Sequence, residues 1–294
     1  METIEMRIMI SIIKQIVKMA YRYQAEIKLS QLRNIKKPKA DKIVNAIHDA
    51  LKNNLEPEEK KWVDRIEEKR RVLNSSSTKI SITDFGAGKP NIARAEAEMY
   101  QGVNRDTTVG ETCRIASKPY FWSLLLFKLI REFKPSNSIE LGTCLGISGA
   151  YQAAAQKLNK SGRLITLEGA KSLASLAEKN FQQLGLDNAY VVSGRFQDNL
   201  DRVLTENKPV DYAFIDGHHD EKATISYFEK FMPYLSKNSI IVFDDISWSD
   251  GMRHAWKKIE NNKVVKISLD LKVIGICVFD ENIDEKYSFR IPIF

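Results

Sequence analysis

A glycine loop between a short apolar run and a helix-forming segment constrains the fold of this chain more than any other feature. The loop lies in the stretch Ser138-Ile-Glu-Leu-Gly-Thr-Cys-Leu-Gly-Ile-Ser-Gly149, and residues 150–158 after it are compatible with a helix. A strand, a tight glycine turn and a helix N-terminus together bring backbone N–H groups close to a ligand. Many α/β domains carry glycines after the first strand, so the loop alone does not identify the ligand.

Acidic residues end the apolar runs that follow this loop. Glu168 ends the first such run, about twenty residues past the loop. Later runs end in Asp216 and in the pair Asp244-Asp245. Acidic residues at the C-termini of several strands predict a ligand crevice in an open parallel sheet.

Strand and helix patterns alternate from residue 120 onward, which indicates βαβ units and a parallel sheet. We expect strands at 138–142, 163–168, 189–193, 210–215, 239–243, 263–269 and 273–279. The expected helices are 121–133, 148–158, 171–184, 197–206, 221–235 and 250–261. The last two strands meet across Asp270-Leu-Lys272, a hairpin signal. The prediction is an α/β fold with a Rossmann-like, seven-stranded, mostly parallel sheet, an antiparallel C-terminal hairpin and a helical N-terminal extension.

The sequence before residue 120 has a different character. Residues 1–73 have the pattern of Lys- and Glu-rich helices broken near Lys37-Pro38 and Glu56-Pro57, and residues 74–78 form a joint. A glycine-punctuated loop at 84–90 opens a long, irregular polar stretch, which we interpret as a lid or, alternatively, as a disordered connector. The expected units are a basic helical arm (1–80), a loop or lid segment (81–119) and the main domain (120–294).

Charge and cysteine content restrict the class of protein. The whole excess of +7 lies in residues 1–80, whereas residues 81–294 carry equal numbers of acidic and basic side chains. A neutral main domain argues against an enzyme that grips nucleic acid in its active site. The arm is interpreted as a solvated helix face or as a contact for an acidic partner or membrane surface. The three cysteines have no zinc or redox spacing, which favours a reducing compartment, the cytoplasm.

The apolar segment 8–20 is neither a secretory signal nor a membrane span, because it contains Lys14 and Lys18, has no small-residue cleavage site and is too short. The spacing of Met9, Ile13, Ile16 and Ala20, with Ile12 and Met19 beside them, predicts an amphipathic helix. We expect its apolar face to pack on the domain or on a second subunit. The second alternative predicts a homo-oligomer through the N-terminal helices.

These features together resemble the class I S-adenosylmethionine-dependent methyltransferases over roughly residues 120–280. The blocks Phe214-Ile-Asp-Gly-His-His219 and Ile241-Val-Phe-Asp-Asp-Ile246 are similar to the metal-dependent small-molecule O-methyltransferases, which include catechol, macrolide and sugar O-methyltransferases. Asp84-Phe-Gly-Ala-Gly88, with Leu141-Gly-Thr-Cys-Leu-Gly146, is similar to a bacterial branch of that group. The resemblance implies methyl transfer from S-adenosylmethionine to a hydroxyl oxygen of a small molecule.

The resemblance also implies a set of cofactor-binding residues. Three loop residues would shape the turn beneath the methionine part of S-adenosylmethionine: Glu140, Gly142 and Gly146. Glu168 would accept hydrogen bonds from both ribose hydroxyls, and Gln197 is a looser candidate for the adenine edge. Cys144 is a departure, because the family loop usually has a glycine there. An ordinary exposed acid at a strand end is the alternative interpretation of Glu168.

Asp216, Asp244 and Asp245 form a second candidate cluster. Adjacent strand ends can bring them together, and three carboxylates in one crevice repel one another unless a cation lies between them. Hard oxygen ligands select Mg²⁺, Mn²⁺ or Ca²⁺, with Mg²⁺ expected first. The family often has an amide where this chain has Asp245. Alternatively, one or two of these residues serve turns, although Ser249 or Asp250 is better placed to cap the helix at 250–261.

Two adjacent histidines follow the first of these aspartates. In the resembling families a general base can follow the first metal-binding aspartate by three positions, which here is His219. A neutral imidazole there would take the proton of the attacking hydroxyl. His218 is the weaker candidate, and a histidine that caps the next helix or lines the site passively is the alternative.

Two other functions remain open at this point. A nucleic-acid methyltransferase is supported by the basic arm and a pI near 9.1, but the chain has no Asn-Pro-Pro-Tyr block and no Pro-Cys nucleophile. A non-catalytic cofactor-binding module, with the arm mediating assembly, is the second. A dinucleotide oxidoreductase is disfavoured, because the loop has Gly-x-x-x-Gly spacing between Gly142 and Gly146. The expected partner is therefore a small hydroxylated acceptor, without nucleic acid and without a transmembrane segment.

Overall fold

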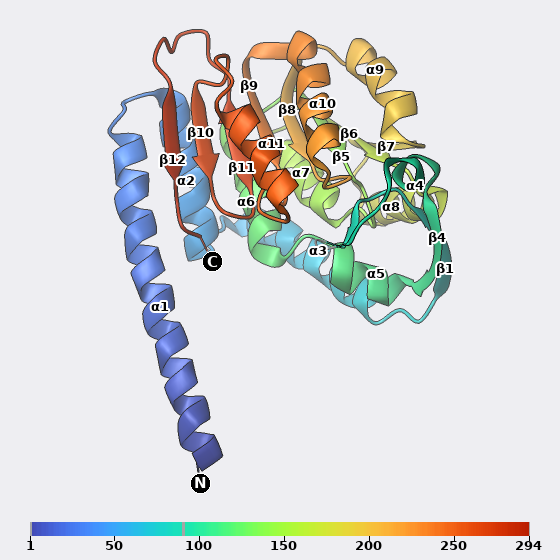
Figure 1. The fold of residues 1–294 in the computed structure, drawn as a ribbon, viewed down its shortest axis with the longest axis horizontal. Coiled ribbons are helices and arrows are strands. Elements are labelled where there is room, and N and C mark those ends of the chain that lie inside the picture. Colours follow the sequence, from blue (N-terminus) through green and yellow to red (C-terminus); the bar gives the residue numbers. More distant parts are fainter. Residues whose placement is uncertain (1, 90–91, 294) are drawn as a thin grey trace.

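An eight-stranded sheet forms the centre of the computed structural model, which describes residues 2–89 and 92–293 (Figure 1). Its strands, in spatial order, are β12 (Tyr287–Arg290), β10 (Ile267–Asp270), β11 (Gly275–Val278), β9 (Leu235–Phe243), β8 (Val210–Ile215), β5 (Asn137–Leu141), β6 (Arg163–Glu168) and β7 (Ala189–Ser193). Strands β5 to β9 run parallel, and β11 is antiparallel to both of its neighbours. The predicted α/β fold with an antiparallel C-terminal end is confirmed.

Helices cover both faces of this sheet. They are α6 (Tyr120–Phe133), α7 (Ile147–Leu158), α8 (Lys171–Leu184), α9 (Phe196–Glu206), α10 (Glu221–Phe231) and α11 (Asp250–Glu260). Successive strand side chains point to opposite faces, so Tyr212 and Phe214 join the core that contains α6 and α7. Ala213 and Ile215 join the core beneath α9, α10 and α11. Burial on both faces explains why these strands are nearly continuous apolar runs.

Two features of the sheet differ from the sequence prediction. The edge strand β12 was not predicted, because Tyr287-Ser-Phe-Arg290 is short and has only half-buried and exposed side chains. The expected helix at 221–235 ends at Phe231 and passes through a 3₁₀ turn (232–234) directly into β9. Pro233 lies within that turn and lacks the backbone donor that a continuing α-helix needs.

The expectation of an irregular stretch before the main domain was wrong. β1 (Lys79–Asp84) and β4 (Val103–Thr108) form a separate antiparallel ladder of six residue pairs. Short elements occupy most of the rest: β2 (Gly88–Lys89), β3 (Ile92–Ala93), α4 (Glu96–Gln101) and α5 (Val109–Ala116). Both strands of the ladder consist mostly of polar residues, so no apolar run signals them in the sequence. Whether this segment acts as a lid stays a prediction.

Three helices make up the N-terminal region, and they break where proline predicts: α1 (Glu2–Arg33), α2 (Pro38–Lys52) and α3 (Pro57–Asn74). Ile47 of α2 and Ile66 of α3 are fully buried in the same core as α6 and α7. The buried Glu59 accepts an ion pair from Lys128 at 2.6 Å and from Arg131 at 2.9 Å. Helices α2 and α3 therefore pack against the α/β body. The expected domain boundary at residue 80 stays a prediction.

Helix α1 contacts the body only through its C-terminal part. Ala25, Leu29 and Leu32 are buried, whereas the N-terminal end projects beyond the rest of the molecule (Figure 1). Met9, Ile12 and Met19 are each at least half exposed, so packing on the domain is wrong for these side chains. The side chains of Ile13 and Ile16 lie outside the described ones, and packing on a second subunit stays a prediction. Within the described residues, no helix combines the length and apolarity that crossing a membrane needs.

Removing Lys128 tests how firmly the arm is fastened. We expect Lys128→Met to lower the free energy of unfolding by about 3 kcal/mol, because it leaves a buried carboxylate with reduced pairing. The double variant Glu59→Gln with Lys128→Met should recover part of that loss. Urea denaturation followed by circular dichroism measures both, and equal losses in the single and double variants would contradict the interpretation.

Candidate active site

A cleft of about 680 Å³ opens at the carboxyl ends of the central strands. Its lining includes seven of the predicted site residues: Gly142, Glu168, Gln197, Asp216, His219, Asp244 and Asp245. Two predicted residues, Glu140 and Gly146, are not part of the lining. Residues 82–88, which run from the end of β1 into β2, also line the cleft.

The glycine loop is tightly packed against the end of β8. Gly142 has a φ of +100°, and a Cβ placed on it would lie 1.9 Å from the backbone oxygen of Asp216. Gly146 has a φ of +79° and precedes α7, and a Cβ there would meet the Phe181 ring at 2.9 Å. Cys144 adopts a φ of +49°, a conformation that favours glycine. The residue that departs from the family pattern thus keeps the backbone shape that glycine would supply.

Glu140 links the glycine loop to the neighbouring elements α7 and β6. Its fully buried carboxylate accepts hydrogen bonds from Ser148, Gln152 and Thr166 at 2.6–2.7 Å. Burial raises the pKa of Glu140 to about 7, although these donors oppose the shift. All three donors belong to α7 and β6, so Glu140 holds the loop in shape and does not face the cleft.

Glu168 does face the cleft from the end of β6. Its Oε2 accepts the backbone N–H of Cys144 at 2.7 Å, and its Oε1 accepts that of Ala170 at 2.9 Å. Burial raises the pKa of Glu168, and the two backbone donors oppose that shift. A carboxylate has about four acceptor positions, so this one retains capacity for further donors. The contact with Cys144 also ties Glu168 to the glycine loop.

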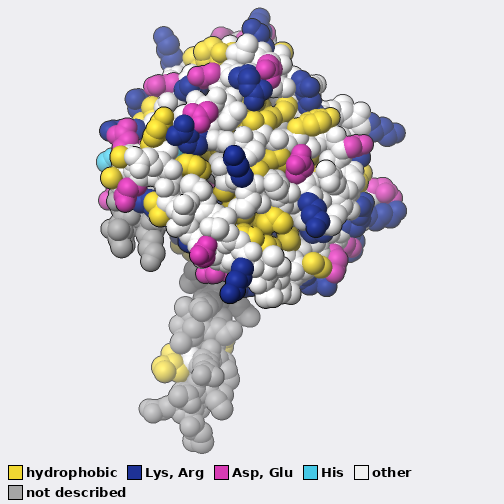
Figure 2. Space-filling view, turned by 90° about the vertical axis from the view of Figure 1, so that its right-hand side faces the viewer, with side chains coloured by type: hydrophobic (Ala, Val, Ile, Leu, Met, Phe, Trp, Pro, Cys, Tyr) yellow, Lys and Arg dark blue, Asp and Glu magenta, His cyan; other side chains and the backbone are white. Residues whose placement is uncertain are grey.

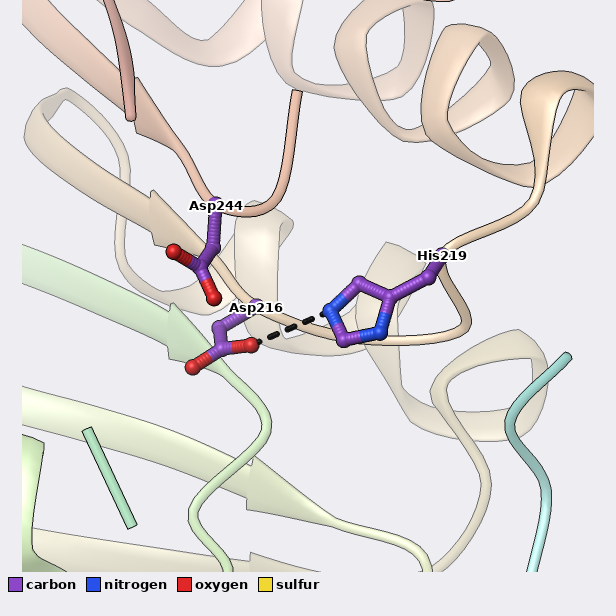
Figure 3. Close-up of side chains that lie close together, drawn as sticks. All are labelled: Asp216, His219 and Asp244. Carbon is purple, nitrogen blue, oxygen red and sulfur yellow. Dashed lines mark hydrogen bonds and ion pairs between the residues drawn. The ribbon is translucent and has the colours of Figure 1, made fainter. Parts of the chain in front are cut away.

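Asp216, His219 and Asp244 come together at the ends of β8 and β9 (Figure 3). One potential ligand atom of each lies within 4.8 Å of the others. His219 Nε2 is 3.2 Å from Asp216 Oδ1 and 3.7 Å from the carboxylate of Asp245. The third predicted aspartate therefore lies at the edge of the cluster, next to the imidazole.

The backbone adopts uncommon conformations at and beside these residues. His218, His219 and Asp245 all have positive φ values, between 51° and 63°. Such residues cost about 1–3 kcal/mol each and persist where the surrounding structure fixes them. Helix capping does not explain the cluster, because Asp220 caps α10 and Ser249 caps α11 with their own side chains. The prediction that Ser249 or Asp250 caps the last helix is confirmed for Ser249.

A lysine that sequence reasoning missed completes the cluster. Lys118, between α5 and α6, contacts Asp244 Oδ2 through its ammonium group and lies 3.5 Å from Asp216 Oδ2. Its side chain is only 9% exposed. Lys118 lies 98 positions before the nearest of these aspartates in a polar segment, so its sequence carries no signal for this role.

Charges within the cluster shift one another. Burial lowers the pKa of Lys118, but the three aspartates outweigh it and raise that pKa, so the ammonium stays charged. Burial opposes ionisation of Asp216, yet Lys118 and His219 lower its pKa. The pKa of Asp244 is raised by burial and by the nearby charge of Asp216. Burial lowers the pKa of His219, but the carboxylates outweigh it and raise the pKa overall.

His218 faces a different environment from His219. Its Nδ1 hydrogen-bonds the hydroxyl of Tyr227 at 2.6 Å, and its ring packs edge-on against Phe196. Burial lowers the pKa of His218 to about 4, so it is neutral at pH 7. Its backbone oxygen accepts the N–H of Ala87 at 2.7 Å, which fastens the 84–88 loop beside the cleft. Of the two histidines, only His219 contacts the acidic cluster.

Comparisons with known proteins identify the domain that carries this cleft. Residues 139–246 match the family model described as a methyltransferase domain. Over 112 residues the chain is 35% identical to the catechol O-methyltransferase of Niastella koreensis, covering 37% of this chain and 49% of that relative. Residues 139–246 are thus similar to a methyltransferase domain. The chain spans about half the length of this curated relative.

Solved structures show the same fold. A provisionally named caffeoyl-CoA O-methyltransferase from Staphylococcus aureus has a TM-score of 0.51 at 16% identity, covering 57% of this chain and 88% of that one. The SAH-bound methyltransferase PaMTH1 of Podospora anserina has a TM-score of 0.50 at 16% identity, covering 56% and 80%. At 16% sequence identity, both similarities show the fold alone.

The acidic cluster of this methyltransferase domain suits a divalent cation. Asp244 Oδ1 is buried and has no hydrogen-bond partner among the described residues. A buried carboxylate oxygen without a donor is costly unless a cation satisfies it. The two carboxylates offer oxygen ligands that Mg²⁺ or Mn²⁺ accepts, and the imidazole lies beside them. The residues present therefore fit a metal.

Gly142→Ala tests the close packing of the loop. We expect it to weaken S-adenosylmethionine binding strongly, because a Cβ would strike the Asp216 backbone and deform the loop. Gly185→Ala is the matched control, because Gly185 also has a positive φ but has no atom within 4 Å of the added Cβ. Calorimetric titration of both variants gives the comparison, and similar affinities would contradict the packing argument.

Proposed function

We propose that this chain transfers the methyl group of S-adenosylmethionine to a hydroxyl oxygen of a small molecule. The observation that carries the proposal is one continuous cleft that joins Glu168 and the glycine loop to the acidic cluster and His219. Bound S-adenosylmethionine supplies an electrophilic methyl group. The match to a catechol O-methyltransferase supports an oxygen acceptor.

The cofactor half of the cleft contains Gly142, Glu168 and Gln197. The absence of a side chain at Gly142 lets the backbone approach a ligand closely. Glu168 is held by two backbone donors and would accept hydrogen bonds from the ribose hydroxyls. Gln197, at the start of α9, would contact the adenine edge.

The acceptor half of the cleft contains the acidic cluster and Trp248, and Trp122 also lines the cleft. Trp248 lies with its ring centroid 5.8 Å from that of His219. Flat apolar walls beside a polar cluster suit an aromatic acceptor that carries hydroxyl groups. Asp216 and Asp244, with Asp245 beside them, would hold a divalent cation, which lowers the pKa of a bound hydroxyl.

We assign His219 as the group that takes the acceptor's proton. Its Nε2 points towards the carboxylates and lies 3.2 Å from Asp216 Oδ1. The hydrogen bond to Asp216 orients the ring, and Trp248 packs beside it. In this proposal the aspartates would orient the oxygen, and His219 would accept the hydroxyl proton at Nε2 as a neutral imidazole once the oxygen has replaced its contact with Asp216.

The face that bears β1 and β4 gives little support to the alternative of a nucleic-acid methyltransferase. Figure 2 shows the side of the molecule that bears β1 and β4, and on it Lys and Arg side chains are interspersed with Asp and Glu. A nucleic-acid site is expected to present a basic stripe. Binding of a DNA or RNA oligonucleotide with a steep salt dependence would support that alternative instead.

The first experiment is titration of S-adenosylmethionine into the purified protein, followed by a methyl-transfer assay with catechol as the first probe. Binding together with metal-dependent methylation supports the proposal. Binding without transfer to any hydroxylated probe favours the non-catalytic module, and failure to bind contradicts both.

Glu168→Gln tests the cofactor half. We expect an approximately tenfold weaker affinity for S-adenosylmethionine, because a neutral amide replaces a charged acceptor. The matched control is Glu178→Gln, which changes an exposed residue of α8. Calorimetry measures both affinities, and an unchanged value for Glu168→Gln would remove this residue from the site.

His219→Asn tests the acceptor half. We expect kcat to fall roughly a hundredfold or more, since the proton acceptor is lost, while Mn²⁺ affinity is retained. Loss of both activity and Mn²⁺ affinity would instead make His219 a metal ligand. His254→Asn is the matched control, because the side chain of His254 is 73% exposed.

A further inference from the structure

Lys118 occupies the position at which a divalent cation would neutralise the acidic cluster. Its ammonium group contacts Asp244 Oδ2 and lies 3.5 Å from Asp216 Oδ2. The second oxygen of Asp216 hydrogen-bonds His219, and the second oxygen of Asp244 is buried without a partner among the described residues. One positive charge thus serves the buried carboxylate of Asp244 and the half-buried one of Asp216, and it leaves one oxygen unsatisfied.

The backbone of Lys118 is held in place by the N-terminal region. Its carbonyl oxygen accepts hydrogen bonds from Arg70 Nη1 at 2.8 Å and from Ser123 Oγ at 3.1 Å. Arg70 belongs to α3 and is itself paired with Glu67, which accepts the hydroxyl of Tyr151 at 2.8 Å. The position of Lys118 is therefore built by contacts between α3 and the methyltransferase domain.

We propose that Lys118 is a resident cation that competes with a divalent metal for Asp216 and Asp244, so that a metal binds only when the lysine side chain swings away. This inference takes the acidic cluster to be the cation site of the proposed function. A lysine side chain has several rotatable bonds, so its ammonium can leave while its anchored backbone stays. The competition would make metal affinity weak and dependent on what else displaces Lys118.

Direct measurement of Mn²⁺ binding tests the competition without any methyl-transfer assay. Electron paramagnetic resonance of free Mn²⁺ gives the affinity of the wild type and of Lys118→Met. We expect the variant to bind roughly tenfold more tightly or better, because a unit positive charge a few ångströms from the metal position is removed. Lys118→Arg, which keeps the charge, should bind no more tightly than the wild type.

Two controls isolate the effect. Lys222→Met removes a lysine whose side chain is 85% exposed, and it should leave Mn²⁺ affinity unchanged. Asp244→Asn combined with Lys118→Met should lose the gain in affinity. If Lys118→Met does not fold, as judged by circular dichroism, Lys118→Gln keeps the polar contacts while removing the charge, and it should show the same gain.

Equal or weaker Mn²⁺ binding by the charge-removing variants would overturn the competition, as would the absence of binding. Titration of S-adenosylmethionine into the same samples separates this result from the proposed function. Failure of the wild type to bind S-adenosylmethionine would contradict the proposed function, whereas the Mn²⁺ comparison would still decide the role of Lys118.

Discussion

Two carboxylates at the ends of adjacent strands, one buried and one half-buried, constrain the rest of this site. The β8–β9 register pairs Ile215 with Phe243, so the next residue on each strand, Asp216 and Asp244, must lie side by side. Like charges in such a place cannot both ionise without a compensating cation. The pKa values diverge accordingly, since Asp216 is held ionised by Lys118 and His219 while Asp244 resists ionisation. A lysine, a metal ion or an acceptor at this edge of the sheet therefore interacts with the same pair of carboxylates.

The same constraint gives the N-terminal helices a role at the active site. Helix α3 fixes the backbone of Lys118 through Arg70, and Glu59 fastens the same helix to α6 by a buried ion pair. The sequence places the excess basic charge in this region, where it is interpreted as a solvated helix face or as a contact for an acidic partner or membrane surface. Two of its cations instead serve the protein internally, because Arg65 and Arg70 donate to the backbone oxygens of Leu184 and Lys118. The net charge of a sequence segment does not distinguish a binding surface from side chains that form intramolecular hydrogen bonds.

Sequence reasoning predicted those parts of the molecule that depend on local pattern. Apolar runs ending in Glu168, Asp216 and Asp244 are local signals, and the strands and the cleft at their carboxyl ends followed from them. Lys118 and the β1–β4 ladder depend on pairing between distant, polar segments, and such pairing leaves no periodic trace. The sequence predicted that Glu140 shapes the loop, but it did not predict that its carboxylate lies outside the cleft. A strand-end acid looks the same in sequence whether it faces a ligand or, as here, three buried donors.

The backbone beside the cluster is strained because the side chains of His219 and Asp245 must lie close to Asp216. To bring His219 and Asp245 towards Asp216, the chain must turn sharply after β8 and after β9, and it does so with positive φ at non-glycine residues. Glycine would adopt these angles freely but would supply no imidazole or carboxylate. The core beneath α9, α10 and α11 offsets this cost, because Phe243, Ile246 and Trp256 are almost fully buried there. Relaxing the turn would therefore stabilise the fold while removing the groups on which the proposed chemistry depends.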